Sequence, residues 1–82
     1  MITRTVADAA TEAAERFAEQ IMEDMPPGTT VVCTPGVVVG NVASTEDQLT
    51  FKVIVNITAE HKQTLEVRVD SNNEVTFKQV SE

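Results

Sequence analysis

The chain has 82 residues, 41% of them hydrophobic, with three Phe and neither Trp nor Tyr. This length predicts a single domain over residues 1–82, whose core consists mainly of aliphatic side chains. The formal charge of −7, from 13 acidic and 6 basic residues, argues against direct nucleic-acid binding, because neutralising phosphates requires clustered Lys and Arg.

The compartment is predicted from the single cysteine and from the lack of long apolar segments. Cys33 cannot form a disulfide within the chain, whereas small secreted domains usually carry paired cysteines. No apolar run approaches the ~20 residues that span a bilayer, and the N-terminal segment has no signal-peptide core. We therefore expect a soluble cytoplasmic protein that does not bind membranes.

Residues 6–25 are predicted to form an amphipathic helix. Thr5 is a favourable N-cap residue, and Asp8 in the first turn suits the positive end of the helix dipole. The Pro-Pro-Gly segment at 26–28 ends the helix, because proline lacks the N–H that the helical ladder needs.

This helix has an apolar face and an acidic face. The apolar face is rich in alanine, which lets the helix lie close to the layer that it covers. The opposite face carries five carboxylates at spacings of three or four residues: Asp8, Glu12, Glu15, Glu19 and Glu23. We call these five residues the acidic stripe and take it as the first candidate partner-binding surface. A merely solvated helix face is the alternative interpretation.

The segment after the helix is rich in β-branched residues and predicts strands at 29–34 and 37–43. The TPGV motif at 34–37 has the residues of a type II turn, with Pro and Gly at its central positions. Two arrangements fit this pattern: a hairpin of two strands, or one long strand kinked at the turn. Gly40 predicts a bulge or a close approach of another backbone.

The clearest strand is 48–57, where apolar and polar residues alternate. Its apolar positions point to one face: Leu49, Phe51, Val53, Val55 and Ile57. Alternation also predicts strands at 63–70 and 74–80, joined by a turn at 71–73. These elements predict an α+β, two-layer fold, in which the N-terminal helix packs on a four- to five-stranded antiparallel sheet.

The outer face of this sheet is predicted to be polar and solvated. It carries Thr50, Lys52, Thr64, Glu66, Arg68, Thr76 and Lys78. Ile54 is an apolar exception, and Val38 and Val42 would lie beside it if their strand were its regular neighbour. These three residues are a candidate self-association patch that would form a homodimer. Isolated surface residues are the alternative.

No motif specifies a reaction, a cofactor or a metal site. Cys33 and His61 are the candidate nucleophile and base, but their contexts favour a core thiol in a strand and an exposed histidine in a turn. One Cys and one His do not supply the three or four ligands of a typical metal site. We therefore expect no enzyme activity and neither a metal nor a cofactor.

Two short stretches resemble known families. The segment 65–77, LEVRVDSNNEVTF, resembles the closing hairpin of PepSY-type domains, with Asn73 where their turn has Gly. The segment 36–40, GVVVG, is similar to the protease-blocking loop of cystatins, with Gly36 in place of their Gln. Each resemblance implies a helix before an antiparallel sheet. The cystatin resemblance implies an inhibitory role, and the PepSY resemblance implies an inhibitory or chaperone-like role next to secreted peptidases. Both stretches are short, and no family is assigned from them.

The leading hypothesis is a non-enzymatic inhibitor that covers a basic surface of a protein partner with its acidic stripe. Small acidic α+β proteins of this class include phage-encoded inhibitors such as anti-CRISPR proteins. The alternative hypothesis is a structural or designed scaffold domain that self-associates through the sheet and has no activity of its own.

Overall fold

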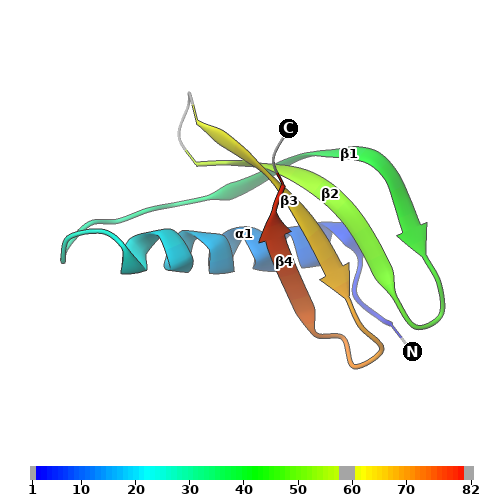
Figure 1. Ribbon diagram of the computed structural model, residues 1–82. Coiled ribbons are helices and arrows are strands. Elements are labelled where there is room, and N and C mark those ends of the chain that lie inside the picture. The colour runs from blue at the N-terminus through cyan, green and yellow to red at the C-terminus, as the bar shows by residue number, and fades with distance from the viewer. Residues whose placement is uncertain (1, 58–60, 81–82) are drawn as a thin grey trace.

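One helix packs on one face of a four-stranded antiparallel sheet (Figure 1). The structure is a computed structural model that describes residues 2–57 and 61–80. Its elements in chain order are α1 (Val6–Glu23), β1 (Thr34–Ser44), β2 (Leu49–Asn56), β3 (Lys62–Val69) and β4 (Val75–Gln79). Each strand pairs with the next, so the order across the sheet is β1-β2-β3-β4. The predicted α+β, two-layer architecture is confirmed.

The helix α1 begins where the sequence predicts and ends slightly earlier. The Thr5 hydroxyl accepts a hydrogen bond from the N–H of Asp8 at 3.1 Å, which satisfies one of the free donors at the helix start. At the other end, the N–H of Asp24 bonds to the carbonyl of Ile21 at 3.1 Å. This i→i−3 bond tightens the last turn just before the two prolines.

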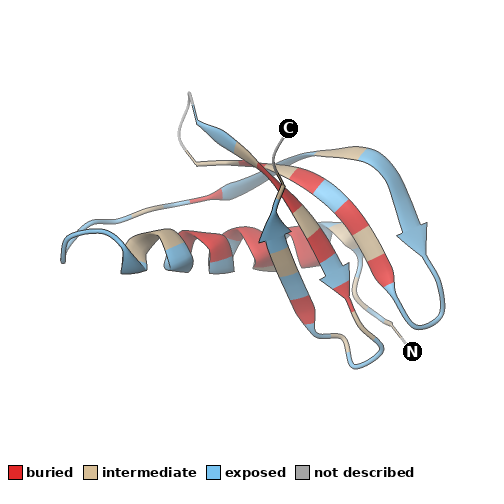
Figure 2. Cartoon of the chain, in the orientation of Figure 1, coloured by how far each residue is buried: buried red, intermediate tan, exposed pale blue. Residues whose placement is uncertain are grey.

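The core lies between α1 and the inner face of the sheet (Figure 2). Its fully enclosed residues come from the alanines of α1 and from alternate positions of β2 and β3: Ala9, Ala13, Ala14, Val53, Val55, Leu65, Val67 and Val69. Small alanine side chains bring α1 close to the strands. The rings of Phe17 and Phe77 then meet edge to face, with centroids 6.1 Å apart, and join α1 to β4.

The segment 29–43 contains one kinked strand, which decides between the two arrangements that fit the sequence. Residues 29–33 lie outside the strands, so the sheet has four strands and the strand expected at 29–34 does not form. The pairing of β1 with β2 is interrupted twice, between Pro35 and Val38 and between Val39 and Ala43. Extra residues at these bulges bend β1 strongly, as Figure 1 shows.

Both interruptions of β1 contain a glycine. Gly40 has a φ of +74°, a left-handed conformation that side chains disfavour. Gly36 lies directly against β2, because a Cβ at this position would be 2.7 Å from the carbonyl oxygen of Ile54. The cystatin-like segment 36–40 is therefore part of a paired strand and does not form a connecting loop.

The turn between β3 and β4 is closed by side-chain hydrogen bonds. The Asp70 Oδ1 atom accepts bonds from the N–H groups of Asn72 at 2.8 Å and Glu74 at 3.0 Å. Asn73 adopts a φ of 63°, which agrees with the turn predicted at 71–73. Its Oδ1 atom accepts a bond from the N–H of Thr3 at 2.9 Å, so the turn also anchors the segment before α1.

Candidate functional site

The acidic stripe lies on the solvent side of α1, opposite its buried alanines. Four of its members are exposed: Asp8, Glu15, Glu19 and Glu23. Glu12 differs from them because its side chain is only 25% exposed. The stripe therefore has the predicted orientation, but its members are not equivalent.

Glu12 is held by two arginines. Its Oε1 atom lies 2.6 Å from Nη2 of Arg4, and its Oε2 atom lies 3.0 Å from Nη2 of Arg16. The Nη1 atom of Arg16 also donates a hydrogen bond of 2.6 Å to the carbonyl of Val75 in β4. Glu12 thus links the segment before α1, the helix and the sheet. We expect these contacts to contribute to stability, and the predicted role of Glu12 in partner binding stays a prediction.

The carboxylates beyond Glu12 form the open part of the stripe. Glu15, Glu19 and Glu23 make no ion pair with any cation in the described part of the chain. The exposed C-cap residue Asp24 adds a fourth carboxylate at the end of the helix. We call Glu15, Glu19, Glu23 and Asp24 the acidic helix face. It covers about 14 Å of helix at ~1.5 Å per residue.

The three apolar residues expected to form a self-association patch do not come together. Val38 pairs with the buried Val53, so it lies on the inner face and packs against the core. Val42 lies in the second bulge of β1 and is 44% exposed. Ile54 is half-buried on the outer face, where it pairs with Thr64. The bulges of β1 shift the register that would have placed the three residues side by side.

Large exposed apolar side chains are instead spread from the end of α1 to the second bulge of β1. Those found in the described part of the chain are Met25, Val32, Val37 and Val42. Val32 is exposed because the strand expected at 29–34 does not form, and Val37 and Val42 are exposed in β1 at the sheet edge. The sequence alone did not reveal this feature, because runs of β-branched residues are also typical of buried strands.

Cys33 and His61 do not have the environment of a catalytic pair. Cys33 is buried just before β1, and burial raises the pKa of its thiol. A raised pKa keeps the thiol protonated near neutral pH, whereas catalytic cysteines need a lowered one. His61 is exposed immediately before β3. Among residues 2–57 and 61–80, no group of three His, Cys, Asp or Glu residues is placed to hold a metal ion.

The outer face of the sheet collects positive charge. Alternate residues of β2, β3 and β4 point to this face, and the pairing aligns them in rows across the strands. Four of the chain's 6 basic residues lie here and are exposed: Lys52, Lys62, Arg68 and Lys78. We call these four residues the basic sheet face. The sequence pattern predicts only a polar, solvated face here, although the signs of charge at alternate strand positions already indicate an excess of cations.

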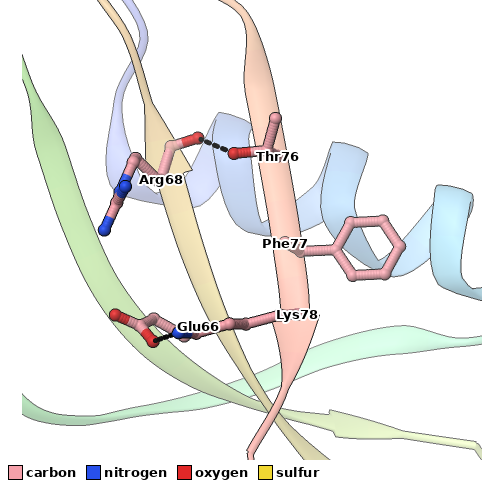
Figure 3. A pocket seen from close by; sticks show the side chains of 5 residues that line it. All are labelled: Glu66, Arg68, Thr76, Phe77 and Lys78. Atoms are coloured by element: carbon pink, nitrogen blue, oxygen red, sulfur yellow. Dashed lines mark hydrogen bonds and ion pairs between the residues drawn. The ribbon is translucent and has the colours of Figure 1, made fainter.

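Glu66 lies at the centre of the basic sheet face. It pairs with Lys52 of β2 in the register, and its Oε2 atom lies 3.2 Å from Nζ of Lys78 (Figure 3). Thr64, in the neighbouring row, is buried rather than solvated. The face is therefore less uniformly solvated than the sequence predicts, but its four cations are exposed to solvent.

Two shallow hollows flank Glu66. One, of about 130 Å³, is lined by Glu66, Arg68, Thr76, Phe77 and Lys78. Figure 3 shows that Phe77 points away from the other four side chains toward α1, so the open surface is polar. The second hollow, of about 160 Å³, lies between the bend of β1 and β2 and includes Lys52. Both are smaller than the ~300 Å³ of a typical small-molecule site. They suit single side chains of a macromolecule.

Comparison with protein-family models, curated protein sequences and solved structures finds no significant match for this chain. No helix in the described part of the chain combines the length and apolar character needed to cross a membrane. The two charged faces of the molecule are its candidate functional surfaces.

Proposed function

We propose that this chain is a non-enzymatic protein-binding module whose acidic helix face covers a basic surface of a partner protein. The supporting observation is that Glu15, Glu19 and Glu23 lack counter-ions within the described residues, while Glu12 holds both arginines near the helix. Because these carboxylates are exposed, a partner can pair with them without displacing an existing ion pair.

The helix presents these carboxylates at a regular spacing. Residues four apart lie about 6 Å from one another along the helix axis at ~1.5 Å per residue. The helix itself is fixed on the sheet by its buried alanines and by Phe17. Such a row of negative charges would exclude other anionic ligands from a basic groove. We therefore propose an inhibitory role, of the kind found among phage-encoded inhibitors such as anti-CRISPR proteins.

We further propose that the module acts in the cytoplasm. Cys33 is a free cysteine in the structure, and an unpaired thiol is typical of proteins in a reducing compartment.

The test of the proposed function replaces charged side chains with neutral side chains of nearly the same size and shape. We expect the triple variant Glu15→Gln, Glu19→Gln and Glu23→Gln to bind its partner less tightly and with a weaker salt dependence. Three exposed ion pairs of about 0.7 kcal/mol each amount to about 2 kcal/mol, roughly a thirty-fold change in Kd. A partner captured from cell lysate by the immobilised wild type, then purified, allows this comparison by titration at low and high salt.

A matched control removes the same number of charges elsewhere. Glu46→Gln, Asp47→Asn and Glu74→Gln change exposed side chains outside α1. This control should bind like the wild type, because only charges near the contact affect it strongly at physiological salt. Equal affinity of the helix variant and the control for the partner would refute the proposed function.

A further inference from the structure

The two layers of the molecule present opposite charges in opposite directions. The inner face of the sheet packs on α1, so the outer face of the sheet and the solvent side of α1 point away from each other (Figure 1). The basic sheet face carries four cations, and Glu66 lies among them. The acidic helix face carries four carboxylates. The net charge of −7 conceals this separation.

We propose that copies of this chain associate head to tail, with the basic sheet face of one copy lying on the acidic helix face of the next. The inference rests on the acidic helix face of the proposed function for one half of the contact and adds the sheet as the other half. We infer a second copy of this chain as the binding partner, because both of the complementary charged surfaces belong to this chain. The contact needs neither a foreign protein nor the dispersed residues Val38, Val42 and Ile54.

The spacing of charges on the two faces is compatible with such a contact. Carboxylates four residues apart on a helix repeat about every 6 Å. Side chains two residues apart on one face of a strand repeat about every 6.7 Å, and neighbouring strands are ~4.8 Å apart. A helix laid across the sheet can therefore place successive carboxylates beside cations of different strands. Lys52, Arg68 and Lys78 provide these cations from β2, β3 and β4.

Arg68 is the best single anchor for a carboxylate. It is exposed and forms no ion pair with a described residue. Figure 3 shows its guanidinium above the Glu66–Lys78 pair, at the side of the hollow of about 130 Å³. A planar guanidinium donates two parallel hydrogen bonds to one carboxylate, which gives stronger and more directional binding than a lysine. We expect Arg68 to bind Glu19 or Glu15 of the neighbouring copy.

The geometry of this contact determines the form of the assembly. The two faces are different surfaces, so a pair of copies keeps one free acidic face on one copy and one free basic face on the other. A heterologous contact of this kind adds further copies, forming chains or closed rings rather than a simple dimer. The average mass should therefore rise beyond that of a dimer as the protein concentration increases.

Salt distinguishes this contact from an apolar one. At about 0.15 M salt the Debye length is ~8 Å, which screens the repulsion between whole molecules but leaves close ion pairs effective. At about 1 M salt the Debye length falls to ~3 Å, and we expect the association to weaken by about tenfold or more. An apolar contact would instead persist or strengthen. Sedimentation velocity of the wild type over a concentration series at both salt levels measures this difference.

Charge reversal on each face provides the deciding experiment. The sheet variant Lys52→Glu and Arg68→Glu makes the centre of the sheet face negative, and the helix variant Glu15→Lys and Glu19→Lys makes the first half of the acidic helix face positive. Each variant alone should sediment as a monomer at about 0.15 M salt, which is close to physiological ionic strength. An equimolar mixture should associate again, because opposite faces then meet. A monomeric wild type at all concentrations, or a mixture that stays monomeric, would overturn the inference.

Controls separate this inference from the proposed function. The variant Glu46→Lys and Asp47→Lys makes the same charge change as the helix variant on an exposed loop, and it should self-associate like the wild type. The sheet variant keeps its acidic helix face, so it should still bind an oligolysine peptide. Suppose that self-association depends on both faces, but that a foreign partner binds the helix variant as tightly as the wild type. This result would refute only the proposed function. Circular dichroism shows whether each variant is folded. If a double variant unfolds, the single variant Arg68→Glu is used for the sheet and Glu19→Lys for the helix, with the same expected outcomes.

Discussion

Gly36 allows the sharpest prediction about stability, because an added methyl group would meet backbone rather than a movable side chain. A Cβ at this position would lie 2.7 Å from the carbonyl oxygen of Ile54 and 3.0 Å from the side-chain nitrogen of Asn56. The Asn56 amide can rotate away, but the carbonyl belongs to the paired strand β2. The first contact is about 0.7 Å shorter than ordinary van der Waals contact. Gly36→Ala therefore requires β1 and β2 to separate.

We expect Gly36→Ala to lower the free energy of unfolding by about 2 kcal/mol, as other overpacking substitutions do. In a domain of this size the midpoint of thermal unfolding should fall by about 8–16 °C. Gly28→Ala is the matched control, because Gly28 has a φ of +90° but nothing within 4 Å of an added Cβ. Its conformational cost should be about 1 kcal/mol. Urea and thermal unfolding, followed by circular dichroism, measure the loss of stability in both variants. A Gly36 variant no less stable than the Gly28 variant would refute the steric argument.

Three further predictions concern the helix, the core and the thiol. Glu12→Gln should lower stability by about 1 kcal/mol by weakening both arginine contacts, while Glu19→Gln should leave urea unfolding unchanged or slightly stabilised. Val53→Ala should cost about 2–3 kcal/mol because Val53 is fully enclosed, and Ile54→Ala on the outer face should cost clearly less in the same assay. Burial raises the pKa of the Cys33 thiol in the folded state. The protonated thiol therefore contributes its full share to the free energy of unfolding below its ordinary pKa, and this contribution is lost as pH rises through the raised pKa of the folded state. Cys33→Ala should remove this alkaline loss; an identical pH profile in the variant would contradict it.

The sequence predicts well those elements whose pattern is repeated locally. The alternation in β2 identifies its inner face, and the N-cap at Thr5 and the prolines after α1 locate the helix ends to within about two residues. These features depend on neighbours along the chain. The turn at Asn73 is predictable for the same reason, since its left-handed conformation is a property of that residue type.

The parts that sequence analysis missed depend on register. In β1, two bulges turn Val38 inward, and no local pattern states how many residues each bulge inserts. The role of Glu12 likewise depends on Arg4, which approaches from the segment before α1. The positive outer face arises only when three strands are aligned, although each strand separately places its cations at alternate positions.

The two edge strands also limit how the sheet can grow. An exposed strand edge normally offers unpaired N–H and C=O groups to another chain, which is a common route to domain swapping and fibril formation. Here β1 is bent by bulges, so it is a poor template for a straight strand. At the other edge, Arg16 donates a hydrogen bond to the carbonyl oxygen of Val75 in the short strand β4. We therefore expect the addition of further strands to be hindered at the bulges of β1 and at Val75 of β4.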